Sequence, residues 1–146
     1  MKLFLKKLRK NAVIPKRATP ESAGIDLCAC IDEPVYIPVG EIRIIPTGLA
    51  ASPENRETAL LIYPRSGLSS RYGVSLANCV GVVDSDYRGE ICVPLINHGK
   101  SEFTVEHGMR IAQLVVSPVI FPEVEECTCL DETLRGTGGF GSTGLI

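Results

Sequence analysis

The stretch Gly73–Ile96, GVSLANCVGVVDSDYRGEICVPLI, decides the fold class of this chain. Its two ends, Gly73–Cys79 and Glu90–Ile96, are rich in the branched apolar residues that β-strands favour. Between them, Gly81–Gly89 carries the Asp and Gly residues that are typical of turns. The stretch therefore predicts two strands, with a polar segment in or beside a hairpin.

The same alternation continues outward in both directions. Fourteen glycines and ten prolines punctuate short runs rich in Val and Ile, in a chain whose 146 residues suit one domain. We expect further strands at Ile25–Ile31, Val35–Val39, Glu41–Ile45, Thr58–Tyr63, Phe103–His107 and Arg110–Val116. Only Ser66–Tyr72 has the composition of a helical turn. The pattern predicts an all-β sandwich or barrel with one short helix.

The charge balance argues against a nucleic-acid or membrane partner. The chain has 15 basic and 17 acidic residues, so it lacks a global basic field, and an anionic ligand must be held by local groups. The first ten residues are partly apolar, but Lys6 and Lys7 interrupt the run that a signal peptide needs. We interpret this segment as a basic surface strand or a frayed end. No stretch approaches the roughly 18 apolar residues of a membrane span, so we expect a cytoplasmic protein.

The six cysteines include two Cys-x-Cys pairs, at 28 and 30 and at 127 and 129. Without a secretory signal we expect reduced thiols. The two pairs could meet as a four-thiolate zinc site, but the usual Cys-x-x-Cys spacing is absent. We favour the interpretation of small buried hydrophobes on strands.

Two segments have the chemistry of phosphate binding. The tail Arg135–Gly144 contains five glycines, whose backbone can approach an anion closely, together with Arg135, Ser142 and Thr143. Only five residues follow Gly141, too few for the helix of a dinucleotide-binding fold, and taken alone the tail favours the interpretation of a disordered segment. The second segment is Pro64–Gly67, where an ordinary N-cap serine with a solvated arginine is the alternative.

Three acidic residues are candidates for chemistry. Asp84 and Asp86 could bind a metal or act as a general base, although turns also use Asp for local hydrogen bonds. Asp26 lies between apolar neighbours, where Arg110 or a hydrated cation would offset the cost of burying its charge. Spacing alone leaves these alternatives open.

In sequence order, five segments resemble the five motifs of the trimeric dUTP diphosphatase (dUTPase) family. They are AGIDL at 23–27, PRSGL at 64–68, GVVDSDYRGE at 81–90, RIAQL at 110–114 and RGTGGFGSTG at 135–144. The resemblance implies a distorted β-barrel or jelly-roll that forms a closed homotrimer. It also implies Mg²⁺-dependent hydrolysis of dUTP to dUMP and pyrophosphate, which limits uracil in DNA and supplies dUMP for dTMP synthesis.

The resemblance assigns roles residue by residue. Asp84 matches the base that activates water for in-line attack on the α-phosphorus, and Tyr87 matches a tyrosine that packs under the deoxyribose and excludes ribose. The backbone that reads the uracil edge corresponds to Asn78, Gly81, Val82 and Val83, with Cys92 lining that pocket. Phosphate contacts correspond to Arg65, Ser66, Gly67 and Gln113, and the closing tail to Arg135, Phe140, Gly141, Ser142 and Thr143.

The resemblance also implies how metal and subunits take part. Asp26 matches an aspartate in the water shell of the metal or in a supporting ion pair, while Mg²⁺ is held mainly by the triphosphate. We expect a barrel over residues 1–134 and a glycine-rich arm over 135–146 that closes over an active site shared between subunits. The alternatives are a dCTP deaminase of the same fold, which the Asp86–Tyr87 pair opposes, and a non-catalytic nucleotide-binding regulator, which the intact Asp84 opposes.

Overall fold

A computed structural model describes residues 1–139 and contains, over that range, eleven strands and one helix. The strands are β1 (Leu3–Lys7), β2 (Ile25–Cys28), β3 (Val35–Ile37), β4 (Ile42–Pro46), β5 (Leu49–Pro53), β6 (Thr58–Tyr63), β7 (Val74–Leu76), β8 (Gly81–Val83), β9 (Cys92–Asn97), β10 (Phe103–Val105) and β11 (Arg110–Pro118). The helix α1 spans Ser66–Tyr72 and ends at Gly73, which adopts a left-handed φ of 70°. The mostly β architecture and the single short helix match the sequence-based prediction.

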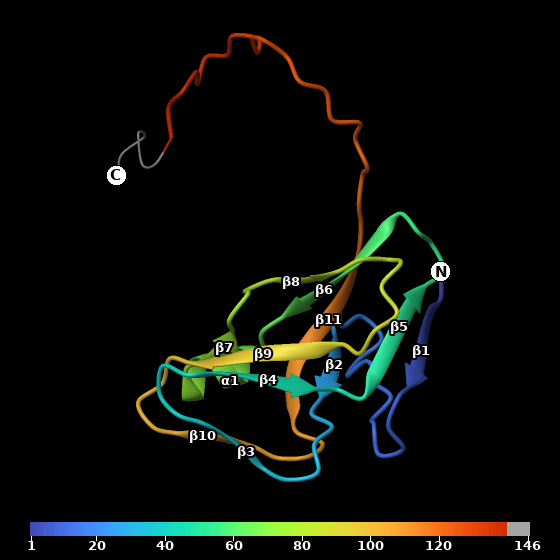
Figure 1. Cartoon of the computed structure of the whole chain (residues 1–146), viewed down its shortest axis with the longest axis vertical. Coiled ribbons are helices and arrows are strands. Elements are labelled where there is room, and N and C mark those ends of the chain that lie inside the picture. The colour runs from blue at the N-terminus through green and yellow to red at the C-terminus, as the bar shows by residue number, and fades with distance from the viewer. Residues whose placement is uncertain (140–146) are drawn as a thin grey trace.

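The strands form four small antiparallel sheets that enclose one core (Figure 1). The largest has the order β2-β11-β6-β8, and the second has the order β4-β9-β7. Two further pairs, β1-β5 and β10-β3, complete the sheets that the structure describes. The core is mostly apolar, and its largest fully buried side chains are Leu27, Ile37, Ile45, Leu49, Leu60, Ile91, Leu95, Ile111, Leu114, Val74, Val93 and Val105.

Strand β11 organises the largest sheet because it pairs along both of its edges. Gln113 lies opposite Asp26 of β2 on one side and opposite Tyr63 of β6 on the other. A register shift between Arg110 and Ala112 ends the regular pairing with β2. Three segments with candidate site residues are therefore brought together at one end of this sheet.

The strand predictions were correct in place but often too long. The helical turn and Thr58–Tyr63 have the predicted bounds, while Ile25–Ile31 shortens to β2 and Gly73–Cys79 to β7. The basic N-terminus is the surface strand β1, paired with β5. Strand β5 was missed because its sequence, LAASP, has no β-branched residue.

The hairpin expected around Asp84 has a different connectivity. β7 pairs with β9, whereas β8 pairs with β6 of the other sheet. The segment between β8 and β9 thus crosses from one sheet to the other and is no simple hairpin turn. The predicted strands at 73–79 and 90–96 do pair, as β7 with β9. Local sequence could not reveal the pairing of β8 with β6, because it joins strands that are not adjacent in the chain.

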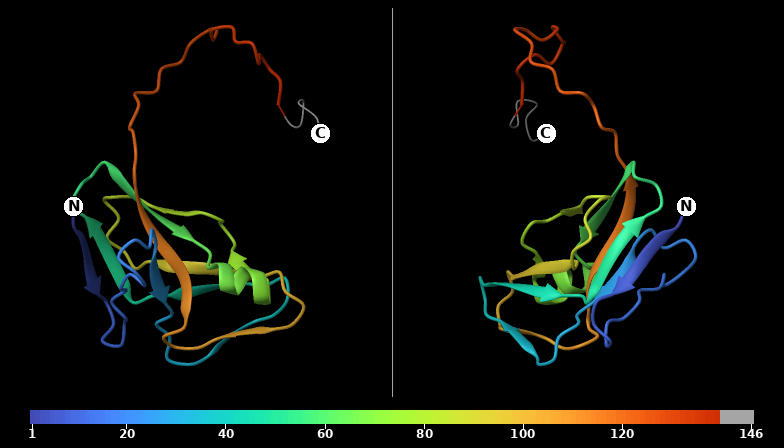
Figure 2. Two further views of the ribbon diagram at one scale, coloured as in Figure 1. Left: turned by 180° about the vertical axis from the view of Figure 1, so that it is seen from behind. Right: turned by 45° about the vertical axis from the view of Figure 1, so that its right-hand side comes forward.

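After β11 the chain leaves the barrel. Residues 122–139 form no helix or strand and run away from the sheets in both views of Figure 2. The expected boundary between residues 134 and 135 stays a prediction, and residues 140–146 lie outside the described range. Within residues 1–139, no helix has the length and hydrophobicity needed to cross a membrane.

The buried amide of Asn97 supports a testable prediction about stability. Its Nδ2 donates to the carbonyl oxygens of Ile37 at 2.8 Å and Ser101 at 2.9 Å, and its Oδ1 accepts from the Gly99 N–H at 2.8 Å. Asn97→Ala leaves these three groups unpaired in a site with no solvent access, so we expect a loss of about 3 kcal/mol in the free energy of unfolding. Urea denaturation measures this loss. The exposed Asn55→Ala should cost less than about 1 kcal/mol, and an equal effect of both substitutions would contradict the account.

Candidate active site

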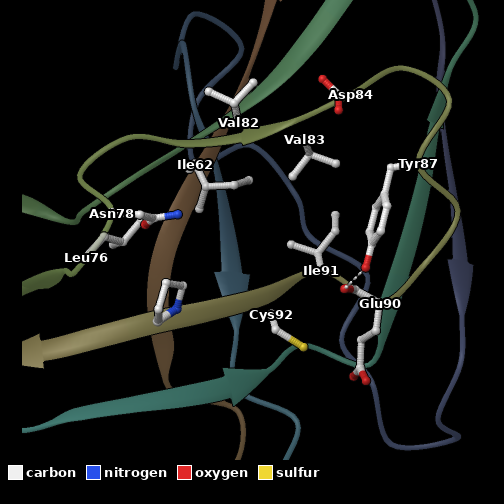
Figure 3. Close-up of a pocket in the computed structure, with 12 residues that line it drawn as sticks. Ile62, Leu76, Asn78, Val82, Val83, Asp84, Tyr87, Glu90, Ile91 and Cys92 are labelled. Atoms are coloured by element: carbon white, nitrogen blue, oxygen red, sulfur yellow. Dashed lines mark hydrogen bonds between the residues drawn. The ribbon is translucent and has the colours of Figure 1, made fainter.

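A small cavity opens between the two main sheets at the segment that follows β7 (Figure 3). Its volume is about 250 Å³. The lining residues come from β6, β7, β8, the start of β9 and the segments that connect β7 to β8 and β8 to β9, and are Ile62, Leu76, Asn78, Gly81, Val82, Val83, Asp84, Tyr87, Glu90, Ile91, Cys92 and Pro94. We call this cavity the nucleoside pocket. It brings together seven of the residues that the sequence assigned to the site, including Asp84 and Tyr87.

Strand β8 forms one wall of the nucleoside pocket and ends at Asp84. Val82 and Val83 point to opposite sides of the strand, as the alternation of a β-strand requires, and Val83 faces the pocket (Figure 3). β8 is an edge strand, paired only with β6, so its other edge presents backbone donors and acceptors. Gly81 fits beside Asn78, because a Cβ at Gly81 would lie 3.2 Å from the Asn78 Nδ2 atom.

Asp84 is exposed at the rim of the pocket, where the chain turns towards Tyr87. The Tyr87 N–H donates to the Asp84 carbonyl at 3.2 Å, so the backbone closes this turn. Among the described residues, neither the Asp84 nor the Asp86 carboxylate takes part in a hydrogen bond or an ion pair. The alternative that Asp84 serves to hold the turn through its side chain is therefore not supported, and the carboxylate is available to a water.

The thiol of Cys92 lies on the floor of the same pocket (Figure 3). Partial burial raises the pKa of the Cys92 thiol above its ordinary value, and the Glu90 carboxylate adds to this rise. At neutral pH the side chain is thus a protonated, uncharged group. Such a group suits a pocket for a neutral base.

A second cavity, which we call the phosphate pocket, lies between the segment that leads into β2, the start of α1 and the first residues of β11. Its volume is about 380 Å³, and it is lined by Ala18, Ser22, Ala23, Gly24, Asp26, Arg65, Ser66, Gly67, Arg110 and Gln113. Arg65 is the N-cap of α1, in place of the expected Ser66, and it is only partly exposed. The interpretation of an N-cap serine beside a solvated arginine was wrong.

Asp26 holds both arginines of the phosphate pocket. Arg65 binds its carboxylate with two nitrogens, Nε to Oδ1 at 2.9 Å and Nη2 to Oδ2 at 3.4 Å. Arg110 Nη1 lies 3.1 Å from Oδ2. The sequence alternative of an ion pair for Asp26 is confirmed, with Arg65 as a partner in addition to Arg110. Since both oxygens are engaged by guanidinium groups, Asp26 offers no free oxygen for direct metal coordination.

Gln113 connects the two phosphate-binding segments. Its Nε2 donates to the Pro64 carbonyl at 2.9 Å, directly before Arg65. A Cβ at residue 24 would lie 2.7 Å from the Gln113 Oε1 atom, so Gly24 is needed for this arrangement. The hydrogen bond from Gln113 fixes the backbone at Pro64, directly before Arg65 and Ser66.

The described residues contain no group of three or more His, Cys, Asp or Glu side chains that could hold a metal ion. Cys30 is buried and its thiol donates to Asn11 Oδ1 at 3.2 Å, while Cys127 and Cys129 are exposed on the chain that leaves the barrel. The four-thiolate zinc alternative is therefore not supported. Cys30 is buried but lies just after β2, and Cys28 lies on β2 but is only partly buried. The interpretation of small buried hydrophobes on strands is wrong for the exposed Cys79, Cys92, Cys127 and Cys129.

The two pockets differ in the charged residues that line them. The nucleoside pocket has two carboxylates, Asp84 and Glu90, and no Lys, Arg or His among its lining residues. The phosphate pocket has two arginines, and the two cavities share no residue. In one chain, the base candidate and the phosphate-binding candidates thus occupy different places.

Sequence reasoning missed the apolar walls of the nucleoside pocket. Ile62, Leu76, Ile91 and Pro94 belong to strands or their ends, and nothing in their periodicity distinguishes a pocket wall from ordinary core. Of the expected tail residues, Arg135 is exposed and lies far along the chain that leaves the barrel. Phe140, Gly141, Ser142 and Thr143 lie outside the described residues.

Comparison with known proteins identifies the family. The family model described as dUTPase matches residues 10–144. The chain belongs to the dUTPase family. Deoxyuridine 5'-triphosphate nucleotidohydrolase from Gloeothece citriformis (strain PCC 7424) is 51% identical over 146 residues, covering 99% of this chain and 98% of that protein. The protein of the same name from Maricaulis maris (strain MCS10) is 54% identical over 138 residues, covering 92% and 90%.

Solved structures agree with this assignment. A mutant dUTPase of Staphylococcus bacteriophage 80alpha with dUpNHpp has a TM-score of 0.88 and 28% identity, covering 99% of both chains. The fold described above is therefore the dUTPase fold. Hydrolysis of dUTP is the known function of this family, and the identity over nearly the whole chain extends this activity to the present member.

The raised pKa of Cys92 leads to a prediction about its reactivity. The thiolate is the reactive form, so a raised pKa leaves less thiolate at a given pH. Cys92, Cys127 and Cys129 are all exposed, but Cys92 lines the nucleoside pocket beside Glu90. At pH 7.5 we expect iodoacetamide to modify Cys92 severalfold more slowly than Cys127 and Cys129, with the difference narrowing as the pH rises. Mass spectrometry of the cysteine peptides measures the rates. Equal rates at pH 7.5 would contradict the assigned environment of Cys92.

Proposed function

We propose that this dUTPase hydrolyses dUTP to dUMP and pyrophosphate with Asp84 as the general base. The observation that carries the proposal is the position of the Asp84 carboxylate, without a side-chain partner at the rim of an otherwise mostly apolar pocket. The attack on the α-phosphorus is in line, by a water that Asp84 orients and deprotonates. Tyr87 lies beside this rim and packs against the deoxyribose.

Uracil is read by the free edge of β8. Backbone N–H and C=O groups on this edge offer a fixed pattern of donors and acceptors, to which Asn78 adds a side-chain amide. Cytosine exchanges one donor and one acceptor, so its binding would leave buried polar groups unpaired. The protonated Cys92 thiol keeps the floor of the pocket uncharged.

The triphosphate needs cations that the nucleoside pocket lacks. It carries about four negative charges, and a pocket with two carboxylates would repel it. We assign the phosphates to Arg65, Ser66, Gly67 and Gln113 of a neighbouring subunit in a closed homotrimer, because one chain holds these residues in a separate cavity. Substrate enters as its Mg²⁺ complex, in which the ion is held by the phosphates and neutralises part of their charge.

Asp26 acts through the arginines that it holds. Its two guanidinium contacts keep Arg65 and Arg110 directed to the same side of the phosphate pocket. With the C-terminal arm in place, Arg135, Ser142 and Thr143 bind the terminal phosphate, Gly141 allows a close approach of the backbone, and Phe140 covers the uracil. By closing over the bound substrate, the arm excludes water from the phosphates.

We expect Asp84→Asn to lower kcat by at least about 10²- to 10⁴-fold and to leave dUTP binding nearly unchanged, because the amide keeps the shape but cannot accept the proton. Steady-state pyrophosphate release gives kcat, and calorimetry with a non-hydrolysable dUTP analogue gives the affinity. Asp32→Asn, which changes an exposed loop carboxylate, is the matched control. Turnover close to that of the control would refute the role of Asp84.

A further inference from the structure

The ring of Tyr87 folds back over the residues that follow it. Its hydroxyl donates to the Glu90 carbonyl oxygen at 3.2 Å, so the ring runs beside the segment Arg88–Gly89 (Figure 3). A Cβ at Gly89 would collide with the Tyr87 hydroxyl and lie 2.5 Å from Cζ and 3.0 Å from Cε2. Real Cβ atoms do not approach other atoms this closely. The observed orientation of Tyr87 therefore requires glycine at position 89.

The requirement for glycine does not come from the backbone conformation. Gly40, Gly48, Gly73, Gly108 and Gly136 are the glycines with a positive φ within residues 1–139, and Gly89 is not among them. Alanine can therefore adopt the backbone of residue 89 without strain. The three nearest heavy atoms that a methyl group would meet there all belong to Tyr87.

Glu90, whose carbonyl oxygen accepts the hydrogen bond from the Tyr87 hydroxyl, is itself held in place through its side chain. The Glu90 Oε1 atom accepts a hydrogen bond from the Gly48 N–H at 2.7 Å and lies 3.7 Å from the Arg9 Nε atom. Arg9 also donates from Nη1 to the Cys30 carbonyl at 3.1 Å. The Arg9–Glu90 pair thus links the wall of the nucleoside pocket to the N-terminal segment. Arg9 lies one residue before the range that the family model matches.

We propose that Gly89 and the Arg9–Glu90 pair are positioning residues that hold the Tyr87 ring against the sugar and so set the selectivity for dUTP over UTP. This inference rests on the proposed function, in which Tyr87 contacts the deoxyribose. Glycine at 89 leaves the space that the ring occupies, and the Arg9–Glu90 pair fixes the carbonyl that receives its hydroxyl. A ring displaced from this place no longer crowds a 2′-hydroxyl, so UTP gains access while dUTP loses no polar contact.

The test compares kcat/KM for dUTP and UTP in five variants. Tyr87→Ala establishes the contribution of the ring, and Gly89→Ala should lower the dUTP:UTP selectivity at least about tenfold, mainly by lowering the KM for UTP. Arg9→Gln should lower it about two- to fivefold, because the pair is partly exposed, and Arg9→Lys should restore most of the loss. Arg43→Gln removes another surface ion pair, with Glu41 at 3.4 Å and away from the pocket, and should leave the selectivity unchanged.

A double-mutant cycle separates positioning from a structural effect. In the Tyr87→Ala background there is no ring to displace, so Gly89→Ala should change the selectivity no further. A folded Gly89→Ala protein with wild-type selectivity, or an equal loss in both backgrounds, overturns the proposal and leaves the role of Tyr87 standing. If Gly89→Ala does not fold, Arg9→Gln decides, and unchanged selectivity there overturns the proposal. Unchanged selectivity in Tyr87→Ala would show that Tyr87 does not discriminate between the two sugars. It would therefore overturn the positioning role of Gly89 and the Arg9–Glu90 pair as well.

Discussion

The two-sided pairing of β11 is the constraint on which the site depends. Its register with β2 and β6 puts Gln113 in one row with Asp26 and next to the residue pair Pro64–Arg65. Asp26 can then hold Arg65 and Arg110, which are 45 residues apart in the chain, by ion pairs at 2.9 and 3.1 Å. A shift of one residue in this pairing would turn these side chains to opposite faces and dismantle the phosphate pocket.

The same sheet also separates the proposed general base from the phosphate-binding residues. Arg65 lies just after the C-terminal end of β6. The edge of β6 that does not pair with β11 pairs with β8, and Asp84 directly follows β8. The cation-bearing cavity and the cavity with the proposed base thus share one scaffold but no lining residue. This arrangement keeps the Asp84 carboxylate away from Arg65 and Arg110 of its own chain. An association between subunits would then bring base and phosphate together only in the assembled enzyme.

Sequence patterns predicted the residues that carry polar chemistry better than those that shape the pockets. Asp84, Tyr87 and Arg65 were assigned their roles by the resemblance to the dUTPase motifs, because spacing alone left structural alternatives open. Ile62 and Leu76 were not, since a pocket wall and a core contact have the same apolar periodicity. The partnership of Asp26 with Arg65 and the need for glycine at 89 depend on side-chain directions, which spacing does not give. The β6-β8 pairing was not predicted either, because it depends on long-range packing.

The central claim, that base and phosphate pocket meet across subunits, is tested most directly by mixing two inactive proteins, Asp84→Asn and Arg65→Gln. After subunit exchange, confirmed by native mass spectrometry, random 1:1 assembly in a closed ring leaves about a quarter of the sites with both residues intact. The account predicts recovery of about a quarter of the wild-type dUTP hydrolysis. No recovery of activity in the exchanged trimers would show that Asp84 and Arg65 act within one chain and would contradict the account.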